Sequence, residues 1–230
     1  MNQSLQYVVV SPVKDEARVV ESTLRSIVNQ THKPVRWVIV DDGSTDGTLE
    51  ILRRYSSHPF IKIIETNRSA PREPGTGVIR AFERGYETVR DLDFDVVVKL
   101  DCDLEFQPDY FETLLSRMKR DNRLGIVSGV YREYNDQGGW HVVKMPQYHA
   151  AGACKVIRRK CFDEIGGFVC SRGWDTVDEI RAMNLGWKTT HFEDLVMSHL
   201  KPEGSGIGSL RTCILHGEVY YKTGGGFRGN

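Results

Sequence analysis

The sequence predicts an α/β protein with a mostly parallel central sheet that carries helices on both faces. In the earlier part of the chain, strand-like and helix-like patterns alternate, which is the order that builds parallel sheets. The strand-like runs are apolar almost throughout, as is usual for strands that are buried on both faces. Beyond Leu124 the pattern changes, so we expect a less regular C-terminal part.

Short apolar runs bounded by polar or turn-forming residues are the predicted strands. The first of them is rich in β-branched residues and is expected to stop at Ser11-Pro12. The strands of the parallel part cover residues 7–10, 37–40, 61–64 and 95–100, and two more are expected at 126–130 and 142–145.

Hydrophobic residues at helical spacing predict a helix after each strand of the parallel part. Ser44 and Asp46 are suitable N-caps for the second helix, and Pro108 lies at or near the first turn of the fourth. Residues 176–185 are a further predicted helix. The apolar residues that define the first four helices are Val20, Leu24, Ile27 and Val28; Leu49, Leu52 and Tyr55; Val78, Phe82, Tyr86 and Val89; and Phe111, Leu114, Leu115 and Met118.

The composition limits the class of protein. A chain of 230 residues suits one large α/β domain, or one domain with an appended lobe. The 31 acidic and 31 basic residues cancel, which argues against a dedicated nucleic-acid-binding protein, because such proteins need an excess of Lys and Arg. The five cysteines form no C-x-x-C pair, so we expect a reducing, cytoplasmic environment. We find no signal-peptide pattern and no apolar run of the ~20 residues that span a bilayer.

Two carboxylates follow the fourth predicted strand at a spacing that suits a metal ion. Asp101 and Asp103 flank Cys102, and side chains two residues apart in an extended segment point to the same side. Carboxylates that lie close together repel each other unless a cation sits between them, and Mg²⁺ or Mn²⁺ prefers such oxygen ligands. The same spacing occurs in residues 91–95, where acids in a connection are usually only solvated. We therefore expect a metal at the later pair, with a turn or capping role as the alternative.

Two other predicted strands also end in acidic residues. Asp41 and Asp42 follow the second strand, where either one accepts hydrogen bonds from a base or ribose, or both belong to an ordinary turn and helix cap. Asp15 and Glu16 follow the first strand. Ligands of such sheets bind beyond the carboxyl ends of the strands, so three acidic strand ends favour a binding site there.

In order and spacing, these motifs resemble the nucleotide-sugar glycosyltransferases of family 2, which have the GT-A fold, a Rossmann-like α/β fold. The family pattern runs P-x-x-(N/D)-E, S-(L/I)-x-x-Q, D-D-G-S-x-D and D-x-D. This chain has PVKDE at 12–16, SIVNQ at 26–30, DDGSTD at 41–46 and DCD at 101–103. The resemblance covers residues 6–115 and continues more weakly at 152–168, which ends in G-G-F.

The resemblance implies a single GT-A domain over residues 1–230, with a nucleotide-sugar-binding half at 1–123 and an acceptor-binding and catalytic half at 124–230. It implies a nucleoside-diphosphate sugar as donor, with uracil as the expected base, bound with Mn²⁺ or Mg²⁺. His199 matches a histidine that in relatives completes the metal site or touches the diphosphate, and a structural hydrogen bond is the alternative. The residues implied for donor binding are Pro12, Val13, Glu16, Asp41, Asp42, Arg68, Arg72, Gly75, Gly77, Lys99, Asp101 and Asp103.

The resemblance also implies a catalytic base that takes a proton from the acceptor hydroxyl. In the family the base belongs to an E-D pair eleven to twelve residues before a helix-closing glycine, and counting back from Gly186 gives Asp175. The chain departs from the pattern here, because Trp174 replaces the Glu, and Asp178 nearby is an alternative base. A purely structural role of Asp175 at the start of the helix is a further alternative.

The expected reaction is transfer of a sugar to a hydroxyl group of a glycan or lipid-linked glycan, with inversion. Trp140 and Trp174 are candidate acceptor-binding residues, because aromatic faces suit the C–H surface of a pyranose; packing is the alternative. The segment 216–226 resembles one that continues into further helices in relatives, so a longer protein that contacts the cytoplasmic face of a membrane stays an alternative. A binding module without a base and a sugar nucleotidyltransferase are the competing functions.

Overall fold

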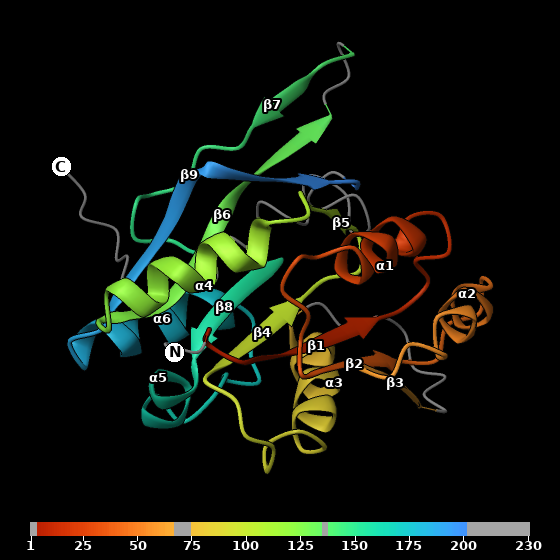
Figure 1. Ribbon diagram of the computed structural model, residues 1–230, viewed down its shortest axis with the longest axis horizontal. Helices are drawn as coiled ribbons and strands as arrows, with labels where there is room; N and C mark the ends of the chain where they lie inside the picture. The colour runs from red at the N-terminus through yellow and green to blue at the C-terminus, as the bar shows by residue number, and fades with distance from the viewer. Residues whose placement is uncertain (1–3, 67–74, 135–137, 202–230) are drawn as a thin grey trace, which may run out of the picture.

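The structure, a computed structural model, describes residues 4–66, 75–134 and 138–201. Its strands form one sheet in the order β3-β2-β1-β4-β8-β6-β9-β5, and β7 pairs with β6 outside this path. In Figure 1 the sheet is twisted, and β6 and β7 extend beyond the helices as a two-stranded ribbon. The strands are β1 (Tyr7–Val13), β2 (Arg36–Asp41), β3 (Ile61–Glu65), β4 (Val96–Leu100), β5 (Leu104–Glu105), β6 (Leu124–Tyr134), β7 (Trp140–Val142), β8 (Cys154–Arg158) and β9 (Lys188–His199).

Parallel pairing dominates the part of the sheet built by the N-terminal half of the chain. Strands β3, β2, β1 and β4 are neighbours and all run parallel, so their carboxyl ends meet at one edge. Beyond β4 the sheet is mixed, because β8 is antiparallel to both β4 and β6, whereas β6 and β9 are parallel. The predicted α/β class is confirmed, and its uninterrupted parallel order ends at β4.

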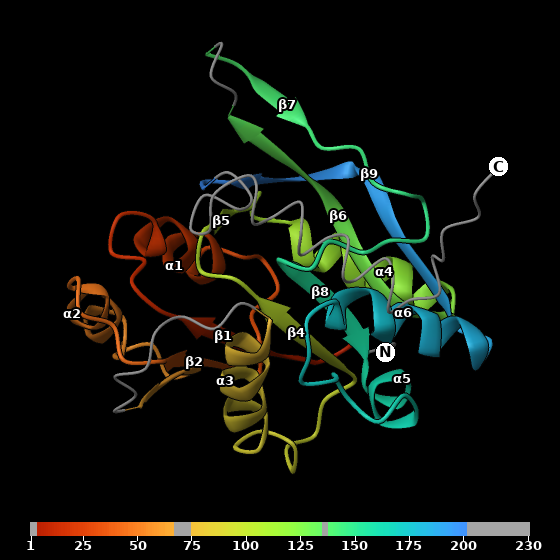
Figure 2. The ribbon, with the colours of Figure 1, turned by 180° about the vertical axis from the view of Figure 1, so that it is seen from behind.

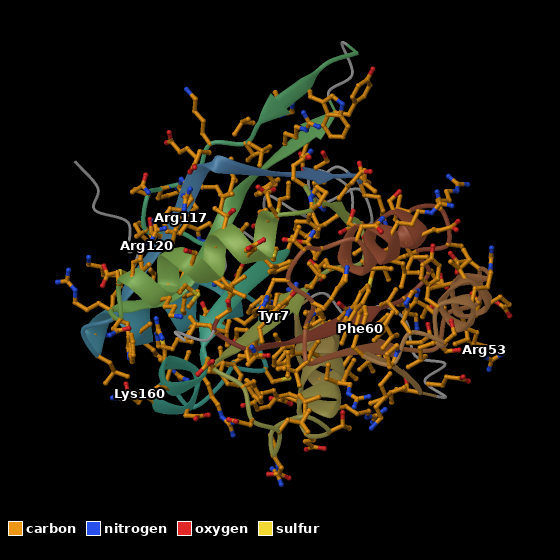
Figure 3. All side chains as sticks on the ribbon, viewed as in Figure 1. Tyr7, Arg53, Phe60, Arg117, Arg120 and Lys160 are labelled. Carbon is orange, nitrogen blue, oxygen red and sulfur yellow. The ribbon has the colours of Figure 1, made fainter. Side chains whose placement is uncertain are left out.

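Helices cover both faces of the sheet. Residues of β1 alternate between two hydrophobic cores, since Tyr7 and Val9 belong to one core and Val8 and Val10 to the other. The first core includes apolar residues of α1, α2 and α4, and the second those of α3, α5 and α6; Figures 1 and 2 show these layers from opposite sides. Figure 3 shows Tyr7 in the interior and Arg53 at the periphery. The helices are α1 (Val20–Val28), α2 (Thr48–Arg54), α3 (Thr76–Tyr86), α4 (Tyr110–Arg120), α5 (Arg159–Glu164) and α6 (Trp174–Asn184).

None of the helices in the described parts of the chain is both long enough and apolar enough to cross a bilayer.

The first strand is longer than predicted. Strand β1 runs through Pro12 to Val13, so the expected end at Ser11-Pro12 was wrong. The pairing of β1 with β4 reaches only to Val10, and the missing N–H of Pro12 therefore interrupts no ladder with β4. The extra residues carry β1 to the edge at which the acidic residues lie.

Candidate active site

The loops that follow β1 and β2 are fastened to each other at the carboxyl edge of the sheet. The backbone N–H of Thr45 donates to Asp15 Oδ1 (2.7 Å), and that of Ala17 donates to Asp46 Oδ2 (3.0 Å). Asp15 has a φ of 54°, a conformation that Asp tolerates better than most residues. The two acidic loops are therefore hydrogen-bonded to each other and lie side by side at this edge of the sheet.

The two aspartates after β2 have different environments. Asp41 is buried, and both of its carboxylate oxygens accept hydrogen bonds from Ser44, one from the backbone N–H (3.2 Å) and one from the hydroxyl. Asp42 is half-buried, and its Oδ1 accepts a hydrogen bond from the Thr66 hydroxyl at 3.0 Å. Asp41 thus has a turn-forming role, and Asp42 presents the more accessible carboxylate.

The donor residues predicted on and after β1 lie at this edge but mostly beneath its surface. Pro12 and Val13 are buried in the strand, and Glu16 is 5% exposed. Both Glu16 oxygens accept hydrogen bonds from Lys201 Nζ, at 2.8 and 2.7 Å. Lys201 could not be predicted from the sequence, because no local pattern indicates a partner 185 positions away.

The acidic pair after β4 lies in a turn that leads into β5, and the predicted extended segment was wrong. Cys102 nevertheless points into the core, while Asp101 and Asp103 stay partly accessible. Asp101 Oδ1 accepts a hydrogen bond from Lys99 Nζ at 2.7 Å, whereas Asp103 Oδ2 is 3.4 Å from His199 Nε2. The turn therefore gives each carboxylate its own basic neighbour.

His199 is held between two acids. Its Nδ1 is 2.7 Å from Glu133 Oε1, and its Nε2 faces Asp103. Burial disfavours the imidazolium ion, but the hydrogen bonds and charges of Asp103 and Glu133 raise the pKa of His199 to about 9. Although burial acts to raise the pKa of Asp103, the contact with His199 lowers it overall. Sequence analysis missed Glu133, which lies 66 positions from His199.

The acids in this corner fit a divalent cation in part. Asp103 Oδ1 is buried and has no hydrogen-bond partner in the described structure, which leaves one hard oxygen ligand available. The predicted set of Asp101, Asp103 and His199 is not assembled, since the described residues contain no group of three or more acidic, His or Cys side chains able to hold a metal. One Asp101 oxygen is bound to Lys99, and the raised pKa of His199 favours a protonated ring. The geometry fits an ion held by carboxylates and completed by water and substrate phosphates.

Two buried lysines flank Trp174 beneath the acidic edge. Lys99 of β4 and Lys155 of β8 lie opposite each other in register, with Nζ atoms 5.1 and 5.5 Å from the centroid of the indole. Trp174 is 6% exposed and also packs edge-to-face against Phe168. The burial of its ring favours the packing alternative over stacking on an acceptor sugar, and the acceptor role of Trp174 stays a prediction.

The first turn of α6 places Asp175 beside Gly152, whose carbonyl binds Lys99. A Cβ atom built on Gly152 would be 2.9 Å from Asp175 Oδ2, so the carboxylate lies directly against the Gly152 backbone. The Gly152 carbonyl accepts a hydrogen bond from Lys99 at 2.8 Å, and Lys99 also binds Asp101. Asp175 and Asp101 are therefore linked through a single lysine and a single glycine.

Asp178, the alternative base, is enclosed in the protein. Its side chain is 1% exposed, and both of its oxygens accept hydrogen bonds from Lys155 Nζ, at 2.7 and 2.8 Å. Burial raises the pKa of Asp178 to about 6 in spite of the neighbouring Lys155. This enclosure disfavours Asp178 as the base and favours Asp175, and the choice between the two stays a prediction.

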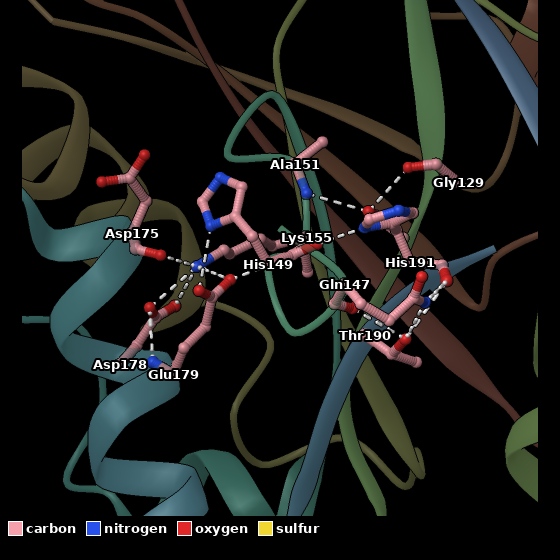
Figure 4. Close-up of polar contacts among 12 residues, drawn as sticks. Gly129, Gln147, His149, Ala151, Lys155, Asp175, Asp178, Glu179, Thr190 and His191 are labelled. Carbon is pink, nitrogen blue, oxygen red and sulfur yellow. Dashed lines mark hydrogen bonds and ion pairs between the residues drawn. The ribbon is translucent and has the colours of Figure 1, made fainter. Parts of the chain in front are cut away.

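Segment 149–152, which carries the glycine beside Asp175, is held from three elements (Figure 4). The backbone N–H groups of its second and third residues donate to Glu179 of α6 (2.8 Å) and to Ser128 of β6 (2.8 Å). The carbonyl oxygen of its first residue lies 2.8 Å from His191 Nδ1 of β9. The backbone on which the Asp175 carboxylate rests is therefore fixed.

Two further predicted donor residues, Gly75 and Gly77, lie at the start of α3. Gly75 approaches Arg172 so closely that a Cβ atom at residue 75 would be 3.1 Å from Arg172 Cα. Gly77 is buried in the first turn of α3. Arg68 and Arg72 lie outside the described residues.

Trp140 lies on the ribbon of β6 and β7 and is 44% exposed. It stands opposite Tyr134 in register, and the guanidinium carbon of Arg132 is 4.8 Å from the centroid of its ring. Arg132 donates a hydrogen bond to the Ser198 hydroxyl at 3.0 Å, which ties the ribbon to β9. The acceptor-binding role of Trp140 stays a prediction, and its exposure is compatible with that role.

Comparison with known proteins places these motifs in a family. The chain matches the profile described as Glycosyl transferase family 2 over residues 8–174. It is 28% identical over 192 residues to the cholesterol galactosyltransferase of Borreliella burgdorferi, a match that covers 79% of this chain and 51% of that protein. It is 26% identical over 137 residues to the chondroitin synthase of Pasteurella multocida, covering 59% of this chain and 13% of that protein.

Solved structures share the fold. The mannosyltransferase PcManGT from Pyrobaculum calidifontis, in complex with GDP-Man and Mn²⁺, aligns with a TM-score of 0.65 and 20% identity over 95% of this chain and 70% of that chain. The fold is that of the GT-A glycosyltransferases. On the profile match, the chain belongs to glycosyltransferase family 2. It spans about half or less of the length of the curated relatives it matches.

Proposed function

We propose that the protein transfers a sugar from a nucleoside-diphosphate sugar to a hydroxyl acceptor, with inversion at the anomeric carbon. One observation carries the proposal. The Asp175 carboxylate lies against Gly152, whose carbonyl is bound by Lys99, and Lys99 also binds Asp101. A candidate base and a candidate site for the donor diphosphate are therefore neighbours, as a direct displacement requires.

The donor would bind at the carboxyl edge of β1, β2 and β4. Asp42 offers its accessible carboxylate to the base or ribose, for which uridine is the first choice. Asp101 and Asp103 would hold Mn²⁺ or Mg²⁺, and Asp103 Oδ1 is the oxygen without another partner in the described residues. The Mn²⁺ and GDP-Man in the mannosyltransferase structure support this class of ligands. When bound, the ion neutralises negative charge on the departing diphosphate.

While no cation occupies the site, His199 would contribute positive charge. Its raised pKa, about 9, favours the imidazolium ion, and its Nε2 faces Asp103. A protonated imidazole donates hydrogen bonds from both nitrogens and does not bind a metal. We therefore assign His199 to contact with the diphosphate and to the orientation of Asp103, and coordination of the ion through Nε2 after loss of the proton is the alternative.

Asp175 would act as the base, accepting the proton of the acceptor hydroxyl as that oxygen attacks the anomeric carbon. Its place in the half-buried first turn of α6 leaves the carboxylate within reach of a substrate, unlike that of Asp178. The exposed ring of Trp140 is the proposed contact for a sugar of the acceptor. The relatives, a chondroitin synthase and a cholesterol galactosyltransferase, support an acceptor hydroxyl on a glycan or a lipid.

A ligand screen followed by a base variant tests this function. UDP, GDP and dTDP are each added with Mn²⁺, and the nucleotide that is the donor product should raise the melting temperature. Nucleotide release from the corresponding sugar nucleotides is then measured for the wild type and for Asp175→Asn. We expect the variant to keep the thermal shift and to lose about 10²–10⁴-fold in kcat. A protein that binds none of the nucleotides, or an Asp175→Asn variant with full turnover, would contradict the proposal.

A further inference from the structure

Lys155 is a fully buried cation, and within the described residues the hydrogen bonds of its ammonium group lead to the first two turns of α6. Its ammonium donates to the backbone carbonyl of Asp175 and to the carboxylate of Asp178 (2.7 and 2.8 Å), and it lies 3.0 Å from Glu179 Oε1. The side chains of Lys155 and Glu179 have no exposed surface. In Figure 4 the backbone oxygen of Asp175 faces the lysine, whereas its carboxylate turns away.

Stability alone gives a poor account of this cluster. Buried charges are costly to remove from water, and apolar residues of the same volume often stabilise a fold equally well or better. A cation is also unfavourable near the N-terminus of a helix, where the helix dipole is positive. Asp178 and Glu179 offset these costs, so two buried acids serve to keep one ammonium group at the start of α6.

The position of Lys155 in the sheet connects it with the donor side of the site. Lys155 lies opposite Lys99, and Lys99 binds both Asp101 and the Gly152 carbonyl. Trp174, the first residue of α6, has both ammonium groups near its ring. One lysine therefore holds the end of β4 and the other holds the start of α6, while the β4–β8 ladder fixes the separation of the two lysines.

We propose that Lys155 is a positioning residue that sets, through the backbone of Asp175, where the Asp175 carboxylate lies relative to Asp101. The inference rests on the proposed function, in which Asp175 is the base. Lys155 touches neither substrate nor reacting atoms in this account. A base displaced by about 1 Å costs on the order of 10²-fold in rate, so a positioning residue has a large effect on kcat without binding anything.

Removing the charge pair as a unit separates positioning from stability. In Lys155→Met/Asp178→Leu the cation and one anion are lost together, while Glu179 loses its contact with Lys155 and keeps those with His149 and the Ala150 N–H. We expect a melting temperature close to that of the wild type and a kcat about 10²-fold lower. Lys155→Gln/Asp178→Asn, an uncharged pair of similar size, serves the same purpose if the first variant does not fold.

The readouts distinguish a displaced base from general damage. Nucleotide release is measured with UDP-glucose, UDP-N-acetylglucosamine and GDP-mannose, using the one that the wild type turns over, and the Kd of the matching nucleoside diphosphate is measured with Mn²⁺. KM and Kd should change little, because the proposed donor edge is formed by β1, β2 and β4. Lys155 lies on β8 and its ammonium group contacts α6. Lys188→Met, which removes a partly exposed lysine paired with Asp121, is the matched control and should keep wild-type kcat.

Three outcomes would overturn the inference. A folded double variant with wild-type kcat shows that Lys155 positions nothing. A loss of nucleotide affinity in step with kcat shows a general structural role. Asp175→Asn is measured in parallel: if it keeps kcat, the base assignment fails and the positioning role fails with it. If Asp175→Asn is inactive while the double variant is active, only the positioning role fails and the proposed function stands.

Discussion

Lys99 and Lys155 stand opposite each other in the antiparallel pair of β4 and β8, and the ring of Trp174 lies near both ammonium groups. Like charges directly opposite each other in a sheet are ordinarily destabilising. Here each cation has its own acid, Asp101 for Lys99 and Asp178 for Lys155, and both ammonium groups also face the electron-rich indole. The buried centre of the site therefore depends on one aromatic residue.

Replacement of Trp174 by Ala is predicted to cost about 3–5 kcal/mol in the free energy of unfolding, because it removes a buried ring that contacts both cations. Chemical denaturation measures this loss. The control is Trp140→Ala, whose ring is 44% exposed and for which we expect less than about 1 kcal/mol. Equal losses in the two variants would show that Trp174 has no special place in the fold.

Asp103→Asn is predicted to weaken Mn²⁺-dependent binding of the nucleoside diphosphate by at least about tenfold. The reason is that Asp103 Oδ1, which lacks a partner in the described structure, would become part of a neutral amide. Titration calorimetry with Mn²⁺, and again with EDTA, measures the effect. Asp121→Asn, which alters a surface pair with Lys188, is the matched control and should bind normally. Unchanged affinity in the Asp103 variant would exclude this residue as a metal ligand.

The sequence predicts the parallel half of the fold because each strand there is a continuous apolar run. Strand β8 escaped prediction because Lys155 interrupts its apolar pattern, although that lysine is fully buried. Strand β9 escaped for a related reason, since Thr189, His191 and Ser198 are buried polar residues in a strand of mixed exposure. A buried polar group is indistinguishable from an exposed one until its partner is known.

The same limit applies within the candidate site. The acids at the strand ends could be assigned to one edge, because parallel strands bring their carboxyl ends together. The burial of Asp178 and Trp174 could not be predicted, because both lie beside buried lysines that a strand pairing between distant segments brings together. The family resemblance proposed Asp175 as the base, which stays a prediction, and only the tertiary structure shows that the neighbouring carboxylate of Asp178 is enclosed.

The raised pKa of His199 predicts a pH-dependent stability of the metal-free protein. The pKa rises from 6.5 to about 9 on folding, so the folded state holds this proton more tightly. The stabilisation is complete below about pH 6.5 and is lost as the pH rises through 9, with an upper limit of about 3 kcal/mol. In EDTA, the melting temperature of the wild type should fall over this range by more than that of His199→Gln. Parallel curves for the two proteins would mean that the contacts with Asp103 and Glu133 do not hold the proton.

Gly152→Ala is predicted to displace the base without unfolding the protein. The backbone of Gly152 is not in the left-handed region, so an alanine meets no conformational penalty there, but its Cβ would be 2.9 Å from Asp175 Oδ2. The carboxylate must move, and we expect kcat to fall about 10²-fold while nucleotide affinity is retained. Comparison with Asp175→Asn tests the cause: if the glycine acts only through that carboxylate, the double variant should be no slower than Asp175→Asn alone. A kcat of the double variant that is lower than that of Asp175→Asn by the full factor lost in Gly152→Ala would show that Gly152 contributes to the reaction by another route.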